Sequence, residues 1–174
     1  IDQNSITRRD LQQFIYPNDA DLERIGVTGL FLGHYLPWNG KKNAEIAEAH
    51  GMELYPTTVE NQMVNYENLD NHINGLHEYI MYLKYGFGRV TTQACILIRH
   101  GQLSRTKALE IVKERDGNFP WTYLGRPIKD VLELLGLTVD EFTQICDRFT
   151  NKKVFRTDNN GKLIKSSNGA PKKL

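Results

Sequence analysis

The sequence predicts a mainly helical protein with a small α/β unit in its N-terminal part. Two patterns lead to this prediction. From residue 70 onward, apolar residues recur at the spacing of amphipathic helices, whereas a single β-prone run precedes them. A length of 174 residues with 40% hydrophobic residues is enough for a core and excludes a wholly disordered chain. No apolar run approaches the length needed to cross a bilayer, so we expect no membrane insertion.

The N-terminal elements form one α/β unit. Capping and acidic residues followed by a glycine predict a short helix over residues 18–25. The run over 27–36 is apolar and β-prone up to a proline, which predicts a buried strand, and a helix follows over about 40–50. Because one strand cannot make a sheet, we expect that residues 1–65 need packing partners that these elements do not provide.

The next part, residues 66–150, is predicted to be helical. The irregular stretch over 52–69 leads into it and is long for a loop, so we expect it to have a functional role or to lack packing. Five helices then follow, marked by capping residues and closing glycines, over about 70–85, 90–100, 104–116, 127–135 and 138–149. Cys95 lies in an apolar helix and is predicted to be a small core residue.

The formal net charge of +1 combines an acidic body with a basic tail. Residues 1–150 carry 15 Lys or Arg against 20 Asp or Glu, whereas residues 151–174 carry seven against one. The tail also contains glycine, serine and proline, which predicts a flexible segment, and we expect deletion of residues 156–174 to leave thermal stability nearly unchanged. The near-neutral total and the acidic residues of the last helix argue against nucleic acid as a partner.

The corner between the first two of these helices, residues 82–92, is the most informative stretch. Gly86 and Gly88 flank an aromatic residue, and Arg89 and Thr91 stand at the start of the next helix. The N–H groups and the dipole at such a start make a site for an anion, such as a phosphate. The alternative is a helical corner whose glycines satisfy backbone geometry and whose arginine pairs with an acidic neighbour, because Gly-x-Gly alone is a weak signal.

Other chemistry is not indicated by the sequence. The five histidines show no metal-ligand grouping and neither cysteine stands in C-x-x-C spacing, so we predict no metal site. No motif of a nucleophile is present, and the catalytic residues are unknown at this stage. Trp38 and Trp121 each follow a proline and are interpreted as packing residues at turns, with stacking on a sugar ring as the alternative.

Several long motifs resemble the C-terminal half of the N-acetyl sugar amidotransferases. These are ATP-pyrophosphatase-type enzymes of lipopolysaccharide and of flagellin-sugar (pseudaminic or legionaminic acid type) biosynthesis. The motifs are YLPWNGKK at 35–42, VNYENLDN at 64–71, YLKYGFGRVTTQA at 82–94 and IRHGQLSR at 98–105. The resemblance extends, in order, over about residues 10–155.

The resemblance implies a ligase reaction in the cytoplasm. ATP, with Mg²⁺, would activate the amide carbonyl of an N-acetyl sugar, nucleotide-linked or free, as an adenylate. Ammonia from a glutaminase partner would then displace AMP and leave an acetamidino group. By the same resemblance, residues 1–65 would be a remnant of the nucleotide-binding domain, which is adenine nucleotide α-hydrolase-like. The positions that match family motifs and are expected to contact substrate or phosphate are Lys84, Gly86, Gly88, Arg89, Thr91 and Arg99.

One departure from the family shapes the functional expectation. The Ser-Gly-Gly-x-Asp-Ser phosphate loop and the paired N-terminal cysteine motifs of such enzymes are not in these 174 residues. We therefore expect the chain to be the C-terminal portion of a longer enzyme and inactive alone. The competing interpretation is a stand-alone helical interaction or regulatory module whose basic tail binds an acidic partner. The oligomeric state stays open, and a homo-oligomer is compatible with the sequence.

Overall fold

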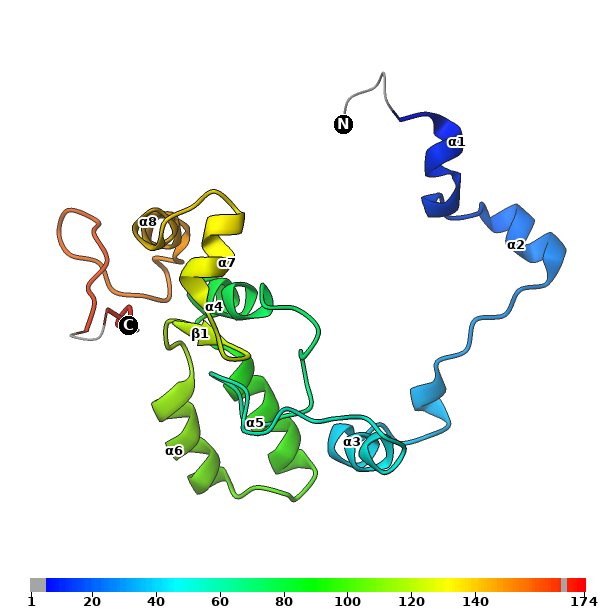
Figure 1. The fold of residues 1–174 in the computed structure, drawn as a ribbon, viewed down its shortest axis with the longest axis horizontal. Coiled ribbons are helices and arrows are strands. Elements are labelled where there is room, and N and C mark those ends of the chain that lie inside the picture. The colour runs from blue at the N-terminus through cyan, green and yellow to red at the C-terminus, as the bar shows by residue number, and fades with distance from the viewer. Residues whose placement is uncertain (1–5, 167–168) are drawn as a thin grey trace. The chain divides into compact units, whose positions relative to one another are not determined.

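The computed structural model describes residues 6–166 and 169–174 and divides into two compact units, residues 1–40 and 41–174 (Figure 1). The division lies earlier in the chain than the boundary that we predicted at residue 65. Residues 54–69 contribute to the second unit, where they pack with its helices. As predicted, the described chain is mainly helical.

The first unit contains short helical segments. They are α1 (Arg8–Leu11), the 3₁₀ turn η1 (Gln12–Phe14), α2 (Asp19–Ile25) and the 3₁₀ turn η2 (Leu32–His34). The predicted helix over 18–25 is confirmed: the Asn18 side chain accepts the N–H of Asp21, and Gly26 ends the helix with φ 75°.

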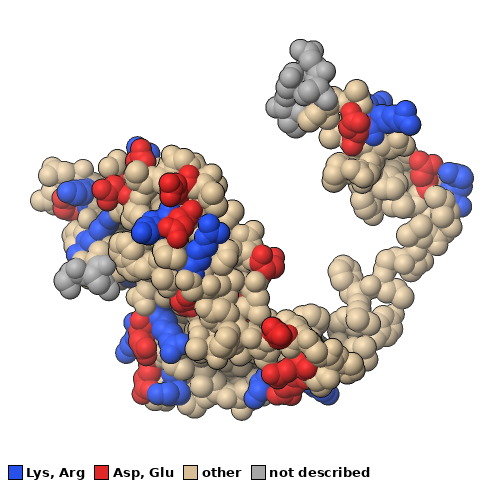
Figure 2. Space-filling view, viewed as in Figure 1, with Lys and Arg blue, Asp and Glu red and all other residues tan. Residues whose placement is uncertain are grey.

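The buried strand that we predicted over residues 27–36 is wrong. These residues form no strand, and Phe31 is 89% exposed. No charged residue stands between Arg24 and Lys41, and Figure 2 shows an uninterrupted run without Lys, Arg, Asp or Glu along this stretch. A strand needs a neighbour to accept and donate its backbone hydrogen bonds, and the described part of this unit offers none.

The second unit contains six helices and a minimal hairpin among its described residues. They are α3 (Gly40–Ala49), α4 (Asn74–Tyr85), α5 (Arg89–Arg99), α6 (Arg105–Arg115), β1 (Thr122–Tyr123), β2 (Arg126–Pro127), α7 (Ile128–Leu134) and α8 (Val139–Phe149). Ser104 caps α6, and Thr138 with Glu141 forms the capping box of α8, as the sequence predicts. No helix in the described ranges is both long and apolar enough to cross a membrane.

The core of this unit lies where α4, α7 and α8 meet. Its buried residues are Leu76, Tyr79, Tyr82 and Leu83 of α4, Ile128, Val131 and Leu132 of α7, Phe142 and Cys146 of α8, and Phe155 of the tail. Helices α5 and α6 pack side by side (Figure 1). Cys95 of α5 is exposed, so its predicted place in the core is wrong. Only the face of α5 with Val90, Gln93 and Ala94 is buried.

The described part of the tail, which we predicted to be flexible, contacts the core and folds back on itself. Phe155 is fully buried and packs against the ring of Tyr82, with ring centroids 5.5 Å apart. Residues 151–166 and 169–174 then fold back on themselves through antiparallel bridges, among them Phe155 with Lys173 and Thr157 with Leu163. The lysines that suggested a solvated tail occupy mainly the exposed positions, while one aromatic residue fixes the segment to the core.

Candidate functional site

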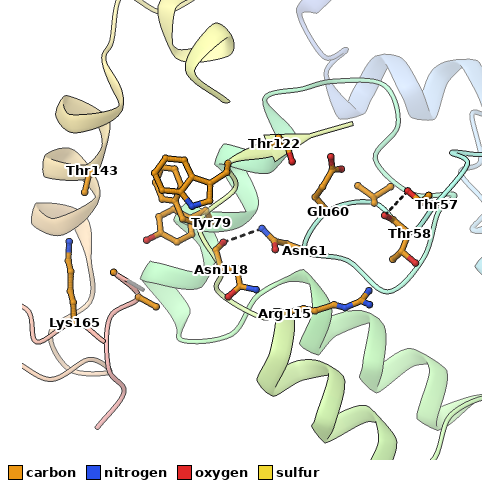
Figure 3. A pocket seen from close by; sticks show the side chains of 15 residues that line it. Thr57, Thr58, Glu60, Asn61, Tyr79, Arg115, Asn118, Thr122, Thr143 and Lys165 are labelled. Carbon is orange, nitrogen blue, oxygen red and sulfur yellow. Dashed lines mark hydrogen bonds between the residues drawn. The ribbon is translucent and has the colours of Figure 1, made fainter. Parts of the chain in front are cut away.

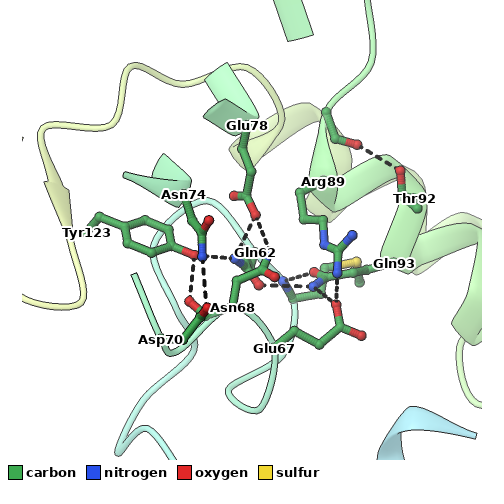
Figure 4. Close-up of polar contacts among 12 residues, drawn as sticks. Gln62, Glu67, Asn68, Asp70, Asn74, Glu78, Arg89, Thr92, Gln93 and Tyr123 are labelled. Atoms are coloured by element: carbon green, nitrogen blue, oxygen red, sulfur yellow. Dashed lines mark hydrogen bonds and ion pairs between the residues drawn. The ribbon is translucent and has the colours of Figure 1, made fainter. Parts of the chain in front are cut away.

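A polar network holds the irregular loop before α4 against the helices. Gln62 is fully buried at its centre. Its Nε2 donates to Oε1 of Glu78 over 3.1 Å and to Oη of Tyr123 over 2.9 Å, and its Oε1 accepts from Nε2 of Gln93 over 3.1 Å (Figure 4). Asn68 adds a 2.7 Å bond from its Nδ2 to the same Glu78 oxygen. The buried polar side chain of the loop, Gln62, is thus fully hydrogen-bonded within the chain.

Glu78 is the titratable group at the heart of this network. Burial raises the pKa of its carboxyl above the usual value. The hydrogen bonds from Asn68 and Gln62 and the charge of Arg89 act in the opposite direction but do not cancel the effect of burial. Glu78 therefore keeps its proton to a higher pH than an exposed glutamate does.

Arg89 closes the network at the start of α5. Its Nη2 lies 2.5 Å from Oε2 of Glu67, which also accepts from Nε2 of Gln93 over 2.9 Å (Figure 4). Its Nε is buried without a hydrogen-bond partner among the described residues. A cavity of about 20 Å³ lies against Arg89, Glu78 and Asp116. It is large enough for one water molecule and too small for a substrate.

The start of α5, where we predicted an anion site, is satisfied by the chain's own carboxylate. Gly88 donates its N–H to Oδ2 of Asp116 over 2.9 Å, and Thr91 donates its hydroxyl to the same oxygen over 2.7 Å. A Cβ at Gly88 would lie 2.5 Å from Oδ1 of Asp116, so only glycine permits this approach. The geometry matches the alternative interpretation, a helical corner whose arginine pairs with an acidic neighbour.

The other predicted residues lie apart from this arrangement. Lys84 is exposed, with Nζ 5.5 Å from the ring centroid of Tyr85 and 5.8 Å from that of Phe149. Gly86 ends α4 with φ 79°, and Arg99 is the exposed last residue of α5. The structure thus gathers Gly88, Arg89 and Thr91 around acidic side chains. Contacts of all six residues with a substrate or a phosphate stay a prediction.

An open cleft of about 850 Å³ is lined by the irregular loop, by residues before and in β1 and by residues of the tail (Figure 3). Aromatic side chains form one wall: Tyr79 meets Phe119 edge to face at a centroid distance of 5.2 Å, and Phe119 lies 4.6 Å from Trp121. Trp121 is 66% exposed. The polar side chains that line the cleft are Thr57, Thr58, Glu60, Asn61, Arg115, Asn118, Thr122, Thr143 and Lys165.

The polar groups of the cleft are held in place by the chain. Nδ2 of Asn61 donates to the carbonyl oxygen of Asn118 over 3.2 Å (Figure 3). Glu60 accepts the N–H groups of Leu124 and Gly125, each over 2.9 Å. Partial burial raises the pKa of Glu60, but these hydrogen bonds outweigh it and hold the pKa below its usual value. The cleft therefore contains a fixed carboxylate that is ionised at neutral pH.

Sequence reasoning found only part of this cleft. Trp121 was a candidate for sugar stacking, but Glu60, Asn61 and Asn118 were not singled out. The available signal was the length of the irregular stretch over 52–69, which indicated a functional role. Among the described residues, no group of three or more His, Cys, Asp or Glu side chains is placed to hold a metal ion.

The fold and the cleft define a mainly helical domain with a partly aromatic, partly polar cleft. Residues 60–168 match the family described as LPS biosynthesis protein WbpG-like, C-terminal domain. This range is more than half of the chain, so the chain belongs to that family, and its predicted relation to lipopolysaccharide biosynthesis proteins is confirmed. No curated protein matches the chain.

Proposed function

We propose that the chain is the C-terminal domain of an ATP-dependent amidotransferase that modifies a bacterial surface sugar. The observation that carries this proposal is the match of residues 60–168 to a C-terminal domain of lipopolysaccharide biosynthesis proteins. The motifs at 64–71, 82–94 and 98–105, which resemble N-acetyl sugar amidotransferases, all lie within the matched range.

The proposed reaction replaces the oxygen of an N-acetyl group by nitrogen. The amide oxygen attacks the α-phosphorus of ATP, so that pyrophosphate leaves and an O-adenylyl imidate forms. Ammonia then adds to the activated carbon, and AMP departs with the former amide oxygen. The product is an acetamidino sugar, and the ammonia comes from a glutaminase partner. We assign no catalytic residue of this chain to either step.

The start of α5 does not fit a phosphate of ATP. The start of α5, the predicted phosphate site, is filled by the Asp116 carboxylate, which would repel a phosphate. The part of the chain that the structure describes also lacks a cluster of metal ligands. We therefore assign the nucleotide and its metal to a phosphate loop elsewhere in the enzyme, and the sugar side of the reaction to this domain.

Pyrophosphate release by the intact enzyme tests the reaction. The enzyme is incubated with ATP, an N-acetyl sugar and ammonium chloride, and each component is omitted in turn. We expect pyrophosphate release to require the sugar, and mass spectrometry to show replacement of oxygen by an NH group. Release that does not depend on the sugar, or a sugar of unchanged mass, would overturn the proposal. Glutamine should replace ammonium only when a glutaminase is added.

Two matched variants decide whether Arg89 contacts the substrate. In the intact enzyme, Arg89→Ala removes the cation and its pairing, whereas Glu67→Gln removes the pairing alone. If Arg89 binds substrate, only the first variant raises KM or abolishes turnover. If its role is structural, the two variants have similar kinetics, and the corner at 82–92 is architecture.

A further inference from the structure

The exposed indole of Trp121 is the first observation that points to a ligand in the cleft. Trp121 packs on Phe119 and lines the cleft, yet two thirds of its surface stays exposed. An exposed tryptophan beside a concave surface offers a flat apolar face with an N–H at its edge. A pyranose ring is complementary to this face, since it has an apolar C–H side and a polar rim.

The polar lining favours hydroxyl and amide groups on the ligand. Four threonines and two asparagines line the cleft. Threonine hydroxyls and asparagine amides both donate and accept hydrogen bonds, as the hydroxyl and acylamino groups of a sugar do. Asn61 and Asn118 are fixed by bonds from their side chains to backbone carbonyls, which leaves their amide oxygens in defined positions. Fixed groups of this kind lower the entropic cost of binding.

The charges in the cleft disfavour a diphosphate. Arg115 donates from Nη1 to the carbonyl oxygen of Gln62 over 3.2 Å, and Nζ of Lys165 lies 2.6 Å from Oδ1 of Asp147. Nε of Arg115 also lies 3.7 Å from Oε1 of Glu114, so both cations are paired with a carboxylate of the chain. Glu60 presents a carboxylate whose pKa is lowered, so a phosphate in the cleft would meet a like charge.

We propose that the cleft binds a neutral N-acylated hexopyranose, with Trp121 stacking on the ring and with Asn61 and Asn118 contacting the acylamino group or hydroxyls. This inference rests on the proposed function in one respect: it takes the bound sugar to be the N-acetyl sugar that the enzyme modifies. It goes further by placing the sugar on Trp121 rather than at the start of α5. Any phosphate attached to the sugar lies outside the cleft.

Saturation-transfer NMR with the 174-residue chain tests the site without ATP. The probe is the methyl glycoside of an N-acetylhexosamine. We expect saturation transfer to the sugar to be lost in Trp121→Ala and partly kept in Trp121→Phe. The matched control is Trp38→Ala, because Trp38 is 77% exposed but does not line the cleft; this variant should behave as the wild type. Circular dichroism verifies that each variant is folded.

Two results of the NMR experiment would overturn the site. One is equal saturation transfer in the wild type and Trp121→Ala. The other is displacement of the glycoside by a free nucleoside diphosphate, which contradicts a neutral cleft. In the intact enzyme, Trp121→Ala should raise KM for the sugar about tenfold, and KM for ATP should not change. An unchanged KM for the sugar in an active enzyme refutes the site alone. Glycoside binding without acetamidino product refutes the proposed function and leaves the site.

Discussion

The segment over residues 27–36 and the tail after residue 150 differ in burial, and each differs from what its composition suggests. The first is apolar and rich in β-prone residues, yet its large side chains, such as Phe31, are exposed. The tail is rich in lysine, yet Phe155 is fully buried and Pro171 is buried as well. The difference shows that a partner surface, rather than average hydropathy, decides which segment becomes ordered by packing.

The same substitution in the two regions gives the largest expected contrast. Phe155→Ala removes an aromatic side chain from the core and should lower the free energy of unfolding by about 3–5 kcal/mol. For a domain of this size, that corresponds to a fall in Tm of roughly ten degrees. Phe31→Ala is the control, because Phe31 is largely exposed and its removal should leave Tm unchanged. If calorimetry shows a similar fall in Tm for both variants, the two regions do not differ in packing as described.

A second variant tests the packing of the tail by a change in its partner, at the glycine that ends α4. In Gly86→Ala, the added Cβ would collide with Cγ1 of Val154, next to Phe155, and the backbone has φ 79°. We expect a loss of about 2–3 kcal/mol, from the strained φ and the displaced tail together. Gly101→Ala isolates the backbone effect, since Gly101 has φ 67° with open space around its Cβ position. Equal denaturation midpoints for the two variants would show that Val154 does not restrain this position.

The loop before α4 extends the comparison to a segment that a polar network holds against the helices. The pKa of Glu78 is higher in the folded than in the unfolded state. The protonated side chain therefore contributes fully to the free energy of unfolding below the unfolded-state pKa, and this contribution is lost as pH rises through the folded-state pKa. Glu78→Gln cannot ionise, and its amide oxygen can still accept from Gln62 and Asn68. We therefore expect the Tm of the variant, relative to the wild type, to increase from acidic to neutral pH. A Tm difference that is constant across this range would mean that Glu78 is not perturbed in the folded state.

The smallest effect is expected when the N-terminal unit is removed. Residues 1–40 form a compact unit separate from residues 41–174, and the core lies entirely within the second. Deletion of residues 1–40 should change the Tm of the remaining unit by no more than about a degree. Scanning calorimetry of the truncated and intact chains measures this difference. A loss of several degrees would show that the exposed apolar residues of 27–36 stabilise the second unit after all.

The helices of the second unit were predictable from the sequence because their signals are local. Ser104, Thr138 with Glu141, and Gly86 mark helix ends through bonds and backbone angles that span only a few residues. The burial of Phe155 was not predictable in this way. It depends on Tyr82 and its neighbours, far away along the chain, and nothing in the local composition of the tail reveals that contact.

In the candidate site too, features with a local sequence signal were predictable and features that depend on distant residues were not. The corner at 82–92 was recognised from its glycines, but its interpretation depended on Asp116, which no local pattern connects to Gly88. The cleft brings together Glu60, Asn61 and Trp121 from an irregular loop and a turn, where neither periodicity nor a motif marks single residues. Local sequence patterns therefore indicate where the chain turns near such a site, but not which side chains line it.

The attachment of the tail to α4 also affects how the domain forms during synthesis. Asn151 donates its N–H to the carbonyl oxygen of Leu83, and its side chain donates to that of Lys84, 67 residues earlier. A nascent chain that has completed α4 must therefore wait until residues 151–155 leave the ribosome before Tyr82 and Leu83 gain their final cover. Contacts of such long sequence separation form slowly. During that interval, the apolar face of α4 is the surface on which a chaperone would act.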